Sequence, residues 1–251
     1  MEYYATAAQV YACGLVFARL GAMVMLIPGF GDDAVSPRIR LSFALLMALL
    51  ITPIVASNIG GPPASVSGLA GAVIKEVLVG LMIGTILRAL TAALNVAGEI
   101  IAIQTTLSFA QTVDPSLGTQ SNAIGSFLGL LGVMIIMTTD LHHLFLGAIV
   151  SSYSLFPFTQ PVPVDDAVTL MTRTVADAFA LGVQLAAPII VFSLVLNVAI
   201  GLISRVMPQF QIFFVTSPLS VLMGLSILAL GLGIIGVVWA DRYRALLQVF
   251  N

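Results

Sequence analysis

Hydrophobic residues fill most of this chain in long runs that are separated by short polar turns. The first run covers residues 5–30 and is interrupted by a single charge, Arg19, before a turn rich in Gly, Pro and Asp. A second run covers residues 41–56 and follows Pro37, a residue that suits the first turn of a helix. Apolar runs of this length predict helices that span a membrane.

The third run is too long for one simple span. Between Ala64 and Asp114 it contains no proline and no cluster of turn residues. A single helix over residues 68–109 would rise about 63 Å at 1.5 Å per residue, whereas the hydrocarbon core of a bilayer is about 30 Å thick. We therefore expect this run to break, to fold back as a hairpin, or to extend well beyond the bilayer.

A polar stripe follows one face of this third run. At 100° per residue, a narrow arc contains Arg88, Thr91, Asn95, Glu99 and Thr106. Thr and Asn in such a helix often hydrogen-bond to neighbouring helices, but a charge inside an apolar run usually faces a bundle interior or an aqueous path. The stripe therefore predicts contacts with other subunits or the lining of a lumen. Its two charges lie about three turns apart, too far for direct pairing along one helix.

The run over residues 124–139 is rich in glycine. Gly125, Gly129 and Gly132 predict a close approach of this helix to a neighbour. Asp140-Leu141-His142-His143 then interrupts the apolar sequence, which resumes over residues 144–158.

Two further uncharged runs, residues 178–204 and 210–240, follow near the end of the chain. The segment Arg205-Val206-Met207-Pro208-Gln209 between them is predicted to be a tight turn. Trp239 and Tyr243, beside the charges that close the last run, are predicted to anchor it at the membrane interface.

The composition agrees with an integral membrane protein. Of 251 residues, 59% are hydrophobic and only 8% are charged, compared with about 25% in soluble domains. A net charge of −2 without a basic stripe argues against nucleic-acid binding. The single cysteine, Cys13, excludes an internal disulfide and a cysteine metal cluster.

Catalytic motifs are incomplete in this sequence. Asp140, His142 and His143 contain metal-ligand groups, but adjacent histidines point apart on a helix and the chain has no other histidine. Ser226, on a Gly-rich helix, is more typical of packing than of an intramembrane protease. No phosphate-binding loop of the GxxxxGK[ST] type occurs. We therefore predict no enzymatic activity, no metal and no cofactor.

The least expected segment runs from Gly98 to Phe127. It contains an apolar cluster of Leu107, Phe109 and Val113, and then opens at Asp114-Pro115 into an uncharged turn of Ser, Gly, Thr, Gln and Asn. A membrane protein keeps such backbone where it is buried in protein or lines a water-filled space.

Within this segment, the run GEIIAIQTTLSFAQTVDPSLG at residues 98–118 closely resembles the FliR family of flagellar biosynthesis proteins. Injectisome counterparts of that family form the T component of type III secretion gates. Residues 38–41 and 204–210 also resemble the family's basic connector and the turn before its final apolar segment. The resemblance covers essentially the whole chain, and its Gly-Glu and Ser-Phe-Ala forms are flagellar in character. One departure is Thr105-Thr106, where Met-Gly is more typical.

The resemblance implies an all-α membrane protein made of kinked helical hairpins. It implies one export-gate subunit over residues 1–251, with a P-like portion at about 1–175 and a Q-like terminal hairpin at about 176–251. Such subunits assemble, as one copy with five P and four Q subunits, into a right-handed helical complex. We expect that complex in the bacterial inner membrane at the flagellar basal body, partly raised above the membrane plane. The B and A export subunits and secreted flagellar proteins are the other expected partners.

The resemblance also implies a function and its residues. The expected function is a structural and gating subunit of the flagellar type III protein export gate, which unfolded flagellar proteins pass; an injectisome T component is the alternative within the family. A loop from Leu107 to Gly118 would plug the closed pore. Its expected constriction residues are Leu107, Ser108, Phe109, Ala110, Val113, Asp114 and Pro115. A turn at the cytoplasmic mouth, near the B subunit, would contain Arg205, Met207, Pro208 and Gln209.

An alternative from a different class is a small-molecule secondary transporter. That function predicts paired broken helices and inverted repeats around a site at the midplane of the membrane. We find no internal repeat of this kind in the sequence.

Overall fold

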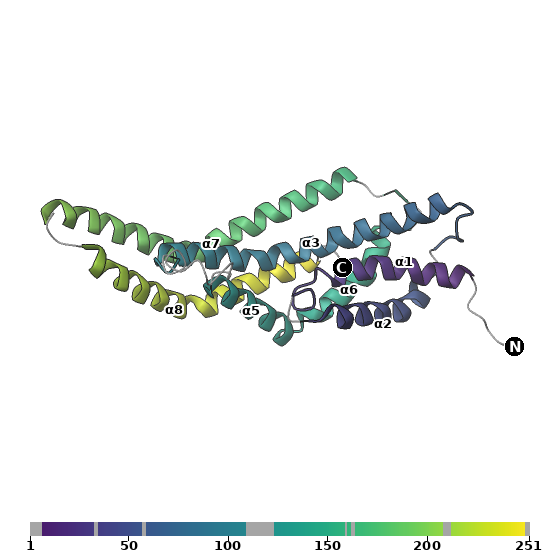
Figure 1. Ribbon diagram of the computed structural model, residues 1–251, viewed down its shortest axis with the longest axis horizontal. Coiled ribbons are helices and arrows are strands. Elements are labelled where there is room, and N and C mark those ends of the chain that lie inside the picture. The colour runs from purple at the N-terminus through teal and green to yellow at the C-terminus, as the bar shows by residue number, and fades with distance from the viewer. Residues whose placement is uncertain are drawn as a thin grey trace. The chain divides into compact units, whose positions relative to one another are not determined.

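The computed structural model describes residues 7–32, 35–56, 59–108, 123–158, 160–161, 164–207 and 212–248, and the elements within them are helices (Figure 1). These helices are α1 (Ala7–Val24), α2 (Pro37–Val55), α3 (Val66–Gln104), α5 (Ala123–Thr138), α6 (Leu141–Leu155), α7 (Val164–Val206) and α8 (Ile212–Gln248). By length and composition, five described helices could cross a membrane, or six spans if α5 and α6 together form a broken span. The predicted all-α membrane fold is confirmed.

The third apolar run forms one helix, α3, of 39 residues. At 1.5 Å per residue it is about 58 Å long, and a tilt of about 40°, near the upper limit for membrane helices, still leaves about 44 Å along the membrane normal. Because α3 is continuous, two of the three expected outcomes, a break and a hairpin, are excluded for residues 66–104. The helix extends beyond a hydrocarbon core of about 30 Å.

Local sequence explains where α1 ends and α2 begins. The turn after α1 contains Gly29 with φ of 84°, a left-handed conformation that glycine adopts without strain. Pro37 occupies the first turn of α2, as predicted, because its fixed φ suits a helix and its missing N–H would have no intrahelical partner there. Ser36 before it is extended, with ψ of 143°.

The chain forms two compact units. The first contains Met1–Leu90, Asp140–Val175 and Arg244–Asn251, and the second contains Thr91–Thr139 and Ala176–Tyr243. The boundaries fall inside α3, α7 and α8, so each of these helices contributes residues to both units. The division into a P-like portion and a Q-like hairpin at about residue 175 stays a prediction.

The first unit is built around α1, which lies beside α2 (Figure 1). Two glycines let the first part of α3 approach α1 and the turn that follows α1 closely. A Cβ atom at Gly80 would lie 2.8 Å from Ala22 Cβ, and one at Gly84 would lie 2.8 Å from Leu26 Cβ. The buried apolar side chains of this unit include Leu15, Val16, Leu20, Met23, Ala44, Ala48, Ile51, Ile83, Ile86, Phe145 and Ile149.

In the second unit, α3 and α5 cross at glycines. Gly98 packs directly on the backbone of Gly125, and a Cβ atom at Gly129 would lie 2.9 Å from Asn95 Oδ1. Gly132, one turn further along α5, lies against side chains of both α3 and α8. The predicted close approach at the glycines of this run is confirmed.

The aromatic residues near the end of α8 are buried. Trp239 and Tyr243 have exposed fractions of 0%, and their ring centroids lie 5.0 Å apart. The Trp239 ring packs against Gly132 of α5. A Cβ atom at Gly132 would lie only 3.4 Å from that ring. The prediction that these two residues anchor the helix at the membrane interface was wrong, because this face of α8 packs into its own unit.

Candidate functional site

The residues of the predicted polar stripe of α3 differ in how exposed they are. Arg88, Asn95 and Glu99 are exposed, Thr91 is buried, and Thr106 is half-buried beyond the end of the helix. An exposed charge on an apolar helix needs water or a polar partner when that helix enters a membrane assembly. The exposed part of the stripe is therefore available for the predicted lumen or inter-subunit contacts, whose role stays a prediction.

The backbone turns sharply where α3 ends. Thr105 is fully buried, and its hydroxyl donates to the carbonyl of Ile101 at 2.8 Å. Thr106 has φ of 60°, in the left-handed region, which is strained for a β-branched residue by about 1–2 kcal/mol. Glycine adopts this conformation freely and commonly follows a helix end in this way. The departure from the family's Met-Gly pair thus falls on the residue where glycine would relieve strain.

Polar side chains join this end of α3 to α7 and α8. Ser193 Oγ donates to Gln104 Oε1 at 2.7 Å, and Asn197 Nδ2 donates to Ser193 Oγ at 3.3 Å. On the other side, the hydroxyl oxygens of Thr106 and Ser217 lie 3.5 Å apart, at the outer limit of a hydrogen bond. These contacts belong to the second unit.

A glycine of α8 completes the contact. A Cβ atom at Gly224 would collide with Cγ2 of Thr105 and lie 3.2 Å from its Cβ. A Cβ atom at Gly231 or Gly233, further along α8, would have open space around it for 4 Å. We call the set around the end of α3 the α3 anchor, and its members are Gln104, Thr105, Thr106, Ser193, Ser217 and Gly224.

The predicted plug begins within the described residues and continues outside them. Leu107 and Ser108 are half-buried, and the backbone N–H of Ser108 donates to the carbonyl of Ala102 at 3.3 Å. The other predicted constriction residues lie outside the described residues: Phe109, Ala110, Val113, Asp114 and Pro115. The plug therefore stays a prediction.

The predicted mouth turn starts later than expected. Arg205 and Val206 still belong to the last turn of α7, where a cation favours the helix dipole, and Met207 is the first residue after the helix. The helix ends here because Met207 precedes Pro208, and the residue before a proline disfavours helical geometry. Arg205 and Met207 are exposed, whereas Pro208 and Gln209 lie outside the described residues.

A buried ion pair in the first unit was not predicted from the sequence. Arg19 Nε lies 2.7 Å from Glu76 Oε2, and the two side chains are 0% and 1% exposed. The guanidinium also donates to the carbonyl oxygens of Ser152, at 3.0 Å, and Phe156, at 2.8 Å, and its carbon lies 4.3 Å from the Tyr153 ring centroid. The available signal was one lone charge, Arg19, in the first apolar run and an opposite charge, Glu76, in another.

Lys75 extends this network. Its Nζ donates to the carbonyl oxygens of Pro157 at 3.0 Å and Phe158 at 2.8 Å, and also to that of Gln160. The last carbonyls of a helix lack intrahelical donors and attract cations. Two cations, Arg19 on α1 and Lys75 on α3, therefore bind the end of α6 and the backbone that follows it.

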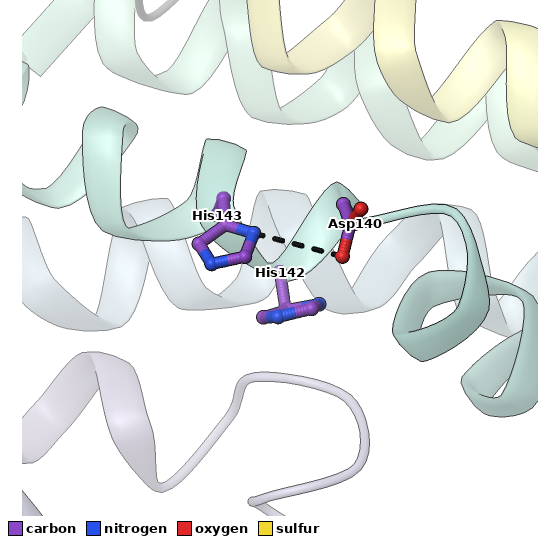
Figure 2. A group of neighbouring side chains, drawn as sticks. All are labelled: Asp140, His142 and His143. Atoms are coloured by element: carbon purple, nitrogen blue, oxygen red, sulfur yellow. Dashed lines mark ion pairs between the residues drawn. The ribbon is translucent and has the colours of Figure 1, made fainter.

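Asp140, His142 and His143 lie at the break between α5 and α6 (Figure 2). Figure 2 shows His143 facing Asp140, with 3.8 Å between Nδ1 and Oδ1, and His142 pointing to another side. Ligand atoms of all three nevertheless lie within 4.8 Å of one another, so the expectation that the adjacent histidines simply diverge was too strong. Rotation about the side-chain torsions can bring ligand atoms of adjacent histidines close together. Asp140, with φ of 58°, turns the backbone between the helices.

The surroundings of this cluster do not favour a cation. The side chains of His143 and Asp140 are 67% and 77% exposed, so water competes for both. The positive end of the α6 dipole lies at the same place. We propose no metal there.

Comparison with known proteins identifies the family. Residues 10–246 match the model of the family described as bacterial export proteins, family 1. This chain belongs to that family. The flagellar biosynthetic protein FliR of Caulobacter vibrioides is 61% identical over 251 residues, which cover 100% of both chains. Relatives with the same name from Pectobacterium carotovorum and Bacillus subtilis are 31% and 30% identical, over 87% and 94% of this chain and 83% and 92% of theirs.

Membership of the export-protein family confirms the resemblance that residues 98–118 indicated. The relatives are flagellar, so the chain is a component of the flagellar type III export apparatus. The apolar helices agree with a place in a membrane.

Proposed function

We propose that this export protein is a structural and gating subunit of the flagellar export gate. It helps to form the channel through which unfolded flagellar proteins cross the bacterial inner membrane, and it does so without enzymatic activity. The observation that carries this proposal is the match over the whole chain to flagellar export relatives. An injectisome T component is less well supported, because the relatives compared are flagellar.

The proposed gate lies directly after α3. The helix ends in the α3 anchor, and the chain then enters the segment that contains the apolar cluster of Leu107, Phe109 and Val113. An apolar constriction can block water and ions by dewetting, and an entering polypeptide displaces it at little cost. Phe109 and Val113 are the proposed occluding groups. Asp114-Pro115 would define the turn, because proline holds φ near −65° and lacks an N–H.

Exposed polar residues of α3 support an aqueous or protein-lined environment. Arg88, Asn95 and Glu99 are exposed on a helix that is otherwise apolar. Lipid would penalise such charges by several kcal/mol. We propose that they line the lumen or contact neighbouring subunits in the assembled gate.

Exposed apolar faces of α7 and α8 support assembly with other membrane proteins. Leu194 and Leu202 of α7 are each 64% exposed, and Leu230 of α8 is 85% exposed. We propose that P-like and Q-like subunits, five and four in number for each copy of this chain, cover these faces together with lipid. The B subunit would dock near Arg205, and the A subunit and secreted flagellar proteins would meet the gate from the cytoplasm. In this assembly residues 1–175 and 176–251 would serve as the P-like and Q-like portions.

Deletion of residues 107–113 tests the gating function. We expect cells that carry the deletion to become leaky to ions while secretion largely persists, because the channel remains and only its closure is lost. Unchanged ion permeability together with lost assembly would contradict the plug.

Purification of the full chain distinguishes an export-gate subunit from a small-molecule transporter. A subunit should co-purify in a large complex of fixed stoichiometry, whereas a transporter should purify alone and remain functional.

A further inference from the structure

One exposed face of the last third of α3 combines a carboxylate with apolar side chains. We propose that this face docks a membrane helix of a partner subunit, and that the partner helix presents a lysine or arginine to Glu99. We call it the Glu99 face, and its members are Ala92, Asn95, Glu99 and Ile103. The inference rests on the proposed place of the chain in the export gate. It deepens that function, because it assigns this part of the polar stripe to a protein partner and not to the lumen.

Helical phasing places the four members together. At 100° per residue they lie within an arc of about 80°. All four are exposed, Ile103 by 61%, and all belong to the second unit. Among the residues that the structure describes, Glu99 forms neither a hydrogen bond nor an ion pair. The carboxylate therefore has no counter-charge within the described part of the chain.

Helix α5 adds apolar surface beside this face. The amide of Asn95 lies against Gly129 of α5, where a Cβ atom would lie 2.9 Å from its Oδ1. Leu130, the next residue of α5, and Met134, one turn further, are 70% and 65% exposed. Large exposed apolar side chains thus lie close to the polar members of the Glu99 face.

Neither lipid nor water suits a surface of this composition. Lipid penalises the unpaired carboxylate of Glu99. Water would solvate that carboxylate, but contiguous apolar side chains such as Ile103 and Leu130 are uncommon on surfaces that stay in water, and they mark sites of protein association. A partner helix satisfies both requirements, because its apolar side chains cover Ile103 and Leu130 while its cation pairs with Glu99.

The shape of the face permits a close approach. Ala92 has no side-chain atom beyond Cβ, and small residues let membrane helices pack closely. Asn95 offers an amide that can hydrogen-bond across the contact. Helices packed in this way have axes about 8–10 Å apart, a distance that lysine and arginine side chains bridge. The charge on the partner is positive, because a second carboxylate would repel Glu99.

The main test measures what covers the face, through a cysteine at position 103 that leaves Glu99 intact. In a Cys13→Ser background, Ile103→Cys supplies the only thiol of the chain. Its reaction with a charged, water-soluble maleimide and with an uncharged, lipid-soluble maleimide is followed in the full chain alone and in the assembled export complex. We expect the lipid-soluble reagent to react readily with the lone chain and about tenfold more slowly in the complex, because the core of a protein interface is packed like a protein interior.

The two reagents separate the possible coverings in the complex. The charged reagent should also react slowly there. A fast reaction with the charged reagent would mean that the face lines a water-filled lumen, and a fast reaction with the lipid-soluble reagent alone would mean that lipid covers it. Either result overturns the docking proposal and leaves the proposed gate function standing.

Glu99→Gln tests the charge. Truncation of one member of a close, covered charge pair weakens binding by about thirtyfold or more. We therefore expect Glu99→Gln to lower the recovery of the complex and to speed the reaction of Ile103→Cys in it, whereas Glu99→Asp, which keeps the charge, should do less. Asp177→Asn removes an exposed acid from α7 of the same unit and is the matched control, which should change neither quantity. Unchanged recovery and an unchanged rate in Glu99→Gln would overturn the pairing.

Photo-crosslinking from position 103 in the complex, read by mass spectrometry, identifies the partner segment. We expect a membrane helix of another subunit with a lysine or arginine within one turn of the crosslinked residue. A segment without a basic residue, or a second copy of this chain, would contradict the proposal. If the unsubstituted full chain never enters an export complex, the proposed function itself fails, and the docking face fails with it.

Discussion

Arg19 and Glu76 form a buried ion pair between α1 and α3, with 2.7 Å between Nε and Oε2, although 57 residues separate them in the chain. Removing two charges from water is costly, and their attraction offsets that cost only when the remaining donors are also satisfied. Here the carbonyl oxygens of Ser152 and Phe156 and the ring of Tyr153 surround the guanidinium. The pair therefore ties α1, α3 and α6 together in the first unit.

Arg19→Leu is expected to destabilise the protein by about 3–5 kcal/mol, because it leaves the Glu76 carboxylate buried without its partner. Arg19→Leu/Glu76→Leu should lose less than Arg19→Leu alone, since no unpaired charge remains. Thermal unfolding of the purified complex measures both. Arg38→Gln, at an exposed position of α2, is the control and should change little. Equal stability of Arg19→Leu and the unsubstituted protein would show that the pair does not support the fold.

Lys75→Met is expected to have a smaller effect, of about 1–2 kcal/mol. The ammonium binds three backbone carbonyls after α6, but the side chain is only half-buried and water can replace part of this binding. Limited proteolysis should show faster cleavage near residues 156–161. Cleavage at the unsubstituted rate would mean that this backbone is held by other contacts.

Gly98→Ala is expected to prevent assembly or lower stability by several kcal/mol. Its Cβ would fall on the backbone of Gly125, which cannot move aside as a flexible side chain could. Gly71→Ala is the matched control on the same helix, because nothing lies within 4 Å of its Cβ position. That control should be neutral or stabilising by up to about 1 kcal/mol through helix propensity. Co-purification with partner subunits measures both variants.

Thr106→Gly is expected to stabilise the folded protein by about 1 kcal/mol, because glycine adopts a positive φ without strain. The gain is reduced by the greater entropy of glycine in the unfolded chain and by the loss of the long contact with Ser217. The melting temperature of the purified complex measures the change. A lower melting temperature would show that the Ser217 contact outweighs the backbone strain.

Arg88→Gln and Glu99→Gln should leave the stability of this chain within about 0.5 kcal/mol, because both side chains are exposed in the single chain. In the assembled gate each substitution should reduce motility, since the charges of Arg88 and Glu99 would face partner subunits or the lumen there. Swimming assays and co-purification from the same cells separate the two effects. Normal assembly and normal motility in both variants would make these charges incidental.

Much of the fold could be predicted because it depends on short stretches of the chain. Long apolar runs indicated the membrane helices, Pro37 marked the start of α2, and the glycines from Gly125 onward indicated where α5 approaches a neighbour. Residues 98–118 indicated the family that the comparisons confirmed. The sequence also located the exposed charges of the stripe, because helical phasing depends only on spacing.

Contacts between distant residues required the tertiary structure. The pairing of Arg19 with Glu76, the burial of Trp239 and Tyr243, and the α3 anchor each depend on which helices become neighbours. In a chain this apolar, hydrophobicity hardly distinguishes a face that meets lipid from a face that meets another helix. Apolar runs and turn residues were enough to predict the long helices, and residues 98–118 were enough to indicate the family. Only the packing of those helices decided which polar groups meet, because helices of similar composition can pack in many ways.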